Sequence, residues 1–170
     1  MNIVDRLLEH NAWATRVLLE RCRALTPEQF SRRFEMGPGS LHDTLRHIIG
    51  AMLRWSDRIA DRTLRSTIEV DSALRSPDEL LALLDRAAAE LGAVARSMRE
   101  ARRLDEVMEV TFGTAAPIRF TRGTAIVHVM THGAHHRAQA LNMLRQLGIR
   151  PDDLPDLDAI EWELVSSAER

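Results

Sequence analysis

The 170-residue chain contains no lysine and no tyrosine, and it has a single cysteine, Cys22. Without lysine it cannot form a Schiff base or supply the lysine of a P-loop, and without tyrosine it has no phenolic acid or base. One cysteine excludes an intrachain disulfide and a cysteine-based zinc site. Histidines and carboxylates are left to carry any chemistry, and four of the seven histidines lie close together: His128, His132, His135 and His136.

An excess of charge of one sign is also lacking. The chain has 23 basic residues, all arginine, and 25 acidic residues, which give a net charge of −2. The two signs are interleaved, so we expect neither nucleic acid nor a membrane as a partner. There is no charged-then-apolar leader and no run of ~18 apolar residues, so we expect a cytoplasmic protein. The length predicts a single domain spanning residues 1–170.

Hydrophobic residues recur with a helical period along most of the chain. The first predicted helix ends before Thr26, the second begins at Ser40 after a Gly-Pro-Gly break, and the third begins at Ser76. Each presents an apolar face at spacings of three and four. The predicted faces are Ile3, Leu7, Asn11, Ala14, Leu18, Cys22 and Leu25; Leu41, Leu45, Ile48, Ile49, Met52, Trp55 and Ile59; and Leu80, Leu84, Ala87, Leu91, Val94 and Met98.

The stretch from Arg103 to Gly123 differs, because β-type residues surround a glycine and a proline there. It predicts a short hairpin or an extended loop. A fourth long helix is predicted from about Thr121 to Leu147, with Gly148 directly after it. Four long helices without an internal repeat predict an all-α four-helix bundle with this hairpin or loop before the last long helix.

Three histidines of the fourth helix, His128, His132 and His136, stand at positions i, i+4 and i+8. Adjacent members of this series can converge on one ion, but the outer two are ~12 Å apart along the axis. A metal ion would therefore take one adjacent pair and a ligand from another helix: His10, His42 or His47. Spacing alone does not choose among these three, and packed or solvated histidines are the alternative. His135 points about 100° away from His136 and is expected to lie outside such a site.

Three blocks of sequence resemble the DinB/YfiT-like family of bacterial metal-dependent proteins. They are Asn11–Trp13, the segment from Gly39 to Ile48 with Trp55 following it, and His132–Gln139, which is similar to the family motif H-x-x-H-H-R-G-Q. The blocks occur in the family's order, and the resemblance covers nearly the whole chain. It implies a four-helix bundle that is often a homodimer and that holds a divalent metal ion.

The resemblance implies that the metal ligands are His47, His132 and His136, with Zn²⁺ or Ni²⁺ as the expected ion. His128 then flanks the site. Two positions depart from the family: Ala138 replaces a glycine, and Met52 stands where many relatives carry an acidic residue. No carboxylate base is therefore expected from position 52, and no catalytic side chain is assigned.

Three functions are compatible with such a site. The resemblance favours an enzyme acting on a small-molecule substrate, in which the metal activates a low-molecular-weight thiol cosubstrate for transfer or isomerisation. The alternatives are a hydrolase that uses a metal-bound water, and a non-catalytic metal-binding stress or dimerisation module.

Among other side chains, we expect Cys22 to be a core residue and Arg137 to pair with an acid of another helix. Arg54, two turns after His47, is expected in a surface salt bridge or against an anionic substrate group.

Overall fold

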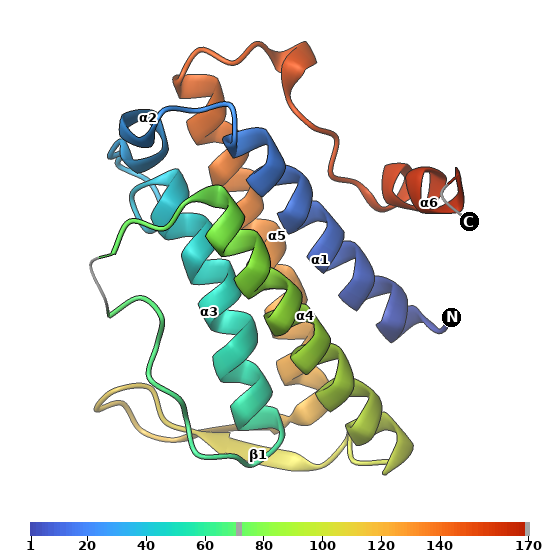
Figure 1. The fold of residues 1–170 in the computed structure, drawn as a ribbon. Coiled ribbons are helices and arrows are strands. Elements are labelled where there is room, and N and C mark those ends of the chain that lie inside the picture. Colours follow the sequence, from blue (N-terminus) through green and yellow to red (C-terminus); the bar gives the residue numbers. More distant parts are fainter. Residues whose placement is uncertain (71–72, 169–170) are drawn as a thin grey trace.

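Four long helices form the bundle in a computed structural model that describes residues 1–70 and 73–168 (Figure 1). An antiparallel hairpin precedes the fourth of these helices. The all-α class, the bundle and the hairpin are thus confirmed. The elements are α1 Ile3–Cys22, α2 Pro27–Ser31, α3 Leu41–Ile59, α4 Pro77–Glu100, β1 Val107–Val110, β2 Ile118–Thr121, α5 Arg122–Gln146, the 3₁₀ turn Pro151–Asp153 and α6 Ala159–Ala168.

The helix boundaries follow from local capping chemistry. The hydroxyls of Ser40, Ser76 and Thr121 each accept a hydrogen bond from a backbone N–H in the first turn of α3, α4 and α5. Ser76 forms a complete capping box with Glu79. None of the described helices is long and apolar enough to cross a bilayer.

The core is built where α3 packs on α4 and α5, and α1 packs on the same two helices. Every apolar residue predicted for α3 and α4 is buried, and Cys22 is fully buried. The prediction for the start of α1 was wrong, because Ile3 and Leu7 are exposed and burial begins at Leu8. Since α1 contacts two helices at once, its buried face is wider and includes Thr15 and Leu19.

Arg137 corrects a second prediction. Arg137 is 5% exposed, and no acid in the described part of the chain pairs with its guanidinium. Nη1 donates instead to Oδ1 of Asn11 at 2.6 Å, to the Asn11 carbonyl at 3.4 Å and to the Thr15 hydroxyl at 3.3 Å. Burial lowers the pKa of Arg137 to about 10. The helix opposite Arg137 is α1, and its facing residues are neutral, so oxygen dipoles take the place of a carboxylate.

Close approach of α1 and α5 is permitted by Gly133, one turn before Arg137. A Cβ atom at this position would overlap Asn11 Oδ1 and lie 2.9 Å from Arg137 Nη1. Asn11 also donates its amide to the sulfur of Met52 on α3 at 3.7 Å. Asn11 of α1 therefore contacts both α3 and α5 through its buried side chain, and these three helices carry the three segments that resemble the family.

Replacing Asn11 with alanine is expected to lower the free energy of unfolding by about 2–3 kcal/mol, because a buried cation loses its shortest hydrogen bond. Urea denaturation followed by circular dichroism measures this. N142A is the control, since Asn142 is exposed and bonds only to Gln146, and a change within about 0.5 kcal/mol is expected there. Equal effects of the two substitutions would contradict a structural role for the Asn11–Arg137 contact.

Candidate metal centre

His47 of α3 and His132 and His136 of α5 meet between the two helices. One ring nitrogen of each lies within 4.8 Å of the others, and all three residues are half-buried. Ring centroids are 4.4–4.8 Å apart. Within residues 1–70 and 73–168, this is the set of histidine, cysteine and acidic side chains whose geometry could hold a metal ion. The structure thus brings together the three residues named by the resemblance.

Hydrogen bonds at Nδ1 orient two of the rings. Nδ1 of His47 bonds to Oε1 of Glu69, and Nδ1 of His136 bonds to Oε1 of Gln139 at 2.8 Å. Because a carboxylate and an amide oxygen only accept, both Nδ1 atoms carry a proton. His47 Nε2 lies 3.0 Å from His132 Nε2, within hydrogen-bonding distance.

Burial and neighbouring imidazoles lower the pKa values of two histidines of the cluster, His132 and His136. Burial first, and then the charges of His136 and His47, lower the pKa of His132 to about 3. Burial also lowers the pKa of His136. The hydrogen bond from His47 lowers the pKa of Glu69. Ring nitrogens that converge from three histidines, one of them backed by a carboxylate, fit a divalent metal ion.

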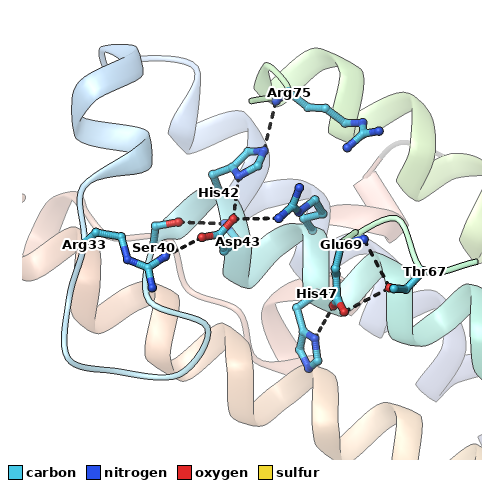
Figure 2. Close-up of polar contacts among 9 residues, drawn as sticks. Arg33, Ser40, His42, Asp43, His47, Thr67, Glu69 and Arg75 are labelled. Atoms are coloured by element: carbon cyan, nitrogen blue, oxygen red, sulfur yellow. Dashed lines mark hydrogen bonds and ion pairs between the residues drawn. The ribbon is translucent and has the colours of Figure 1, made fainter. Parts of the chain in front are cut away.

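Glu69 is the site residue that sequence reasoning missed. It lies on the connection between α3 and α4, where its Oε2 accepts from the Thr67 hydroxyl at 3.1 Å (Figure 2). Ile68 packs so closely on α3 that a Cβ at Gly50 would lie 3.3 Å from its side chain. The connection has no periodicity that would mark it. Met52, by contrast, is buried in the core, in agreement with the expectation that position 52 supplies no base.

Two further residues of the His132–Gln139 motif, Gln139 and Ala138, have distinct positions relative to the cluster. Gln139 orients His136 and donates its amide to His135 at 3.0 Å. The loop before α3 packs directly against Gln139. A Cβ at Gly37, which has φ +48°, would lie only 2.8 Å from Gln139 Cδ, so this position has no room for a side chain. Ala138 is exposed, so its departure from the family glycine does not touch the cluster.

The other histidines lie elsewhere. His135 is exposed and outside the cluster, as expected. His128 flanks the cluster, with its ring 5.6 Å from that of His132. His42 is buried at the start of α3, bonding to Asp43 at 3.0 Å and accepting from the Arg75 N–H at 3.1 Å (Figure 2). His10 bonds to the Leu157 carbonyl at 2.8 Å and packs on Trp162 of α6.

A cavity of about 480 Å³ opens beside the cluster, toward the N-terminal end of α3. It gives a small molecule access to two of the three histidines and to the carboxylate behind one of them. Its lining residues are Gly37, Pro38, Asp43, Arg46, His47, Glu69 and His136.

The connection that carries Glu69 is anchored by Asp57, whose side chain is 3% exposed. Asp57 accepts from the backbone N–H of Arg65 at 3.1 Å and from its guanidinium at 2.6 and 2.7 Å. Arg65 also bonds to Glu90 of α4. The side-chain and backbone hydrogen bonds from Arg65 lower the pKa of Asp57.

Fold and site together define a helical bundle with a three-histidine cluster able to hold a metal ion. The DinB family model matches residues 1–169, so the chain belongs to the DinB family. A curated relative is Protein DinB of Bacillus subtilis (strain 168), which is 22% identical over 146 residues, covering 84% of this chain and 85% of the relative. The family resemblance noted in the sequence is thereby confirmed.

The D57N substitution is expected to lower the free energy of unfolding by about 1–3 kcal/mol at pH 7, because hydrogen bonds to a buried carboxylate are lost. Since the folded pKa of Asp57 is lowered, its contribution is complete above the ordinary value of 3.8 and is lost as the pH falls through the folded value. Urea denaturation between pH 7 and pH 2 should show the difference shrink below pH 3.8. D85N, which removes an exposed pair with Arg16, should change little at either pH.

Proposed function

We propose that the protein is a metal-dependent enzyme whose divalent ion, Zn²⁺ or Ni²⁺, is held by His47, His132 and His136. The observation that carries this proposal is the convergence of three imidazole nitrogens from two helices beside an open cavity. Three protein ligands leave a coordination position for a substrate. An ion held in this way supplies Lewis-acid chemistry and lowers the pKa of a thiol or water that reaches it.

The chain's own residues prepare that site. Glu69 and Gln139 hold the protons at Nδ1, so that the Nε2 atoms of His47 and His136 are available as ligands. The only cysteine, Cys22, is fully buried and its pKa is raised by burial to about 12. Thiol chemistry here would therefore need an external thiol, and the transferase or isomerase reaction with a small thiol cosubstrate is proposed from the family resemblance. Hydrolysis is the second candidate, since the Glu69 carboxylate lines the same cavity and can accept a proton.

Metal content tests the ligand assignment. Protein purified without a histidine tag and dialysed against Zn²⁺ or Ni²⁺ should hold about one ion per chain by elemental analysis. H47A, H132A and H136A should each lose this ion, whereas H135A should keep it because His135 lies outside the cluster. Wild-type protein with no metal, or H132A with unchanged metal, would show that the assignment is wrong.

Glu69 should matter through His47 rather than by binding metal itself. E69Q is expected to weaken metal affinity about 10–100-fold, because the carboxylate no longer orients and polarises the ring. Competition titration against a chromophoric chelator measures the affinity. E100Q, at an exposed position of α4, should leave it unchanged. An E69Q affinity equal to that of wild type would remove Glu69 from the site.

Activity separates the candidate functions. Turnover of an electrophile that requires added thiol, stops with a chelator and returns with metal supports the transferase. Ester hydrolysis that needs metal but no thiol supports the hydrolase. A metal-loaded protein inactive in both assays supports a non-catalytic module. The homodimer stays a prediction, which sedimentation equilibrium can test.

A further inference from the structure

Two arginines of α3 share the face of the helix that carries His47. Arg54 and Arg58 follow His47 by seven and eleven residues, which places them within about 20° of it and roughly 10 and 16 Å further along the axis. Gly50 and Ala51 lie between His47 and Arg54 in the helix, and Ile68 packs closely on Gly50. The two arginines therefore lie toward the C-terminal end of α3, whereas the 480 Å³ cavity lies toward its N-terminal end.

A continuous series of ring contacts joins the histidine cluster to Arg58. The ring of His132 lies 5.6 Å from that of His128, and His128 lies 5.0 Å from Trp55. The Arg58 guanidinium in turn lies 5.2 Å from the Trp55 ring and 5.3 Å from Phe112. Cation–π contact with two neighbouring aromatic rings holds this guanidinium beside Trp55 and Phe112.

Acidic partners for Arg54 and Arg58 are lacking among residues 1–70 and 73–168, where neither forms an ion pair. Nearby carboxylates are engaged elsewhere: Asp57 by Arg65, Asp61 by Arg122, and Glu69 by His47. Glu109 lines the same 620 Å³ groove as Arg58 but is not bonded to it.

The two guanidiniums also act on each other. Burial and the charge of Arg54 lower the pKa of Arg58, and the opposing effect of Asp57 is smaller. Positive charge on this part of α3 is thus incompletely balanced by the protein, and an oxyanion would balance it with charge-assisted hydrogen bonds.

We propose that Arg54 and Arg58 bind the oxyanion of a substrate whose other end reaches the three-histidine cluster. The substrate class is an elongated small molecule that carries a carboxylate or phosphate roughly 10 Å from the group that meets the cluster. Its middle lies along the exposed ring of His128, which lies between His132 of the cluster and Trp55. This proposal rests on the proposed function and adds the substrate's charge and length to it.

A matched pair of thiols tests the proposal on the metal-loaded protein. 8-Mercaptooctanoate should bind about tenfold more tightly than the neutral 8-mercaptooctanol by calorimetry, because only the acid reaches the arginines. R54Q should abolish this preference while keeping the metal, and R86Q, at an exposed position of α4, should keep both. Equal affinities in the wild type, or a preference that survives in R54Q, would overturn the proposal.

A second measurement does not depend on the metal. In metal-free protein, inorganic phosphate should shift the guanidinium NMR signals of Arg54 and Arg58, with a weaker effect at Arg58 in R54Q. Absence of these shifts in the wild type overturns the anion site even if metal binds. If the wild-type protein binds no metal but phosphate still shifts these signals, the proposed function is wrong and the anion site is supported.

Discussion

The buried guanidinium of Arg137 is the contact on which the rest of the structure depends. It lies against Asn11 and Thr15 of α1, and it is charged in a place where only neutral oxygens can receive it. A buried cation tolerates little change in its hydrogen-bond geometry, so this contact sets the rotation of α5 about its own axis. His136 precedes Arg137 by one residue and therefore faces α3, about 100° around the helix.

The site depends on a second constraint, which is the charge state of the histidines. Half-buried imidazoles crowded within 5 Å repel an extra proton, and burial and this crowding lower the pKa values of His132 and His136. Two loops make this arrangement specific. The loop with Gly37 presses on Gln139, and the connection with Glu69 is held down by Asp57 and Arg65. The bundle positions the rings, and Glu69 and Gln139 hold a proton at Nδ1 of His47 and of His136.

Sequence reasoning succeeded where periodicity and capping carry the information. The faces of α3 and α4, the caps at Ser40 and Ser76, and the end of α5 were all predicted. It failed where a contact joins distant segments. Arg137 was expected to meet an acid, since an arginine pairs with carboxylates more often than with neutral groups, but nothing in its own helix shows what faces it. Glu69 was missed because its role requires the connection to fold back over Gly50.

The sequence by itself determined the helices, the bundle, the family and the histidines able to serve as ligands, because these follow from local spacing and from a motif contained in short segments. It did not choose among His10, His42 and His47 by spacing, and the resemblance was needed to name the last. Only the tertiary structure decided that His47 meets α5, that a loop carboxylate stands behind it, and that no acid among residues 1–70 and 73–168 pairs with Arg54 or Arg58. These are distances between segments remote in sequence, and they exist only once the helices have packed at defined rotations.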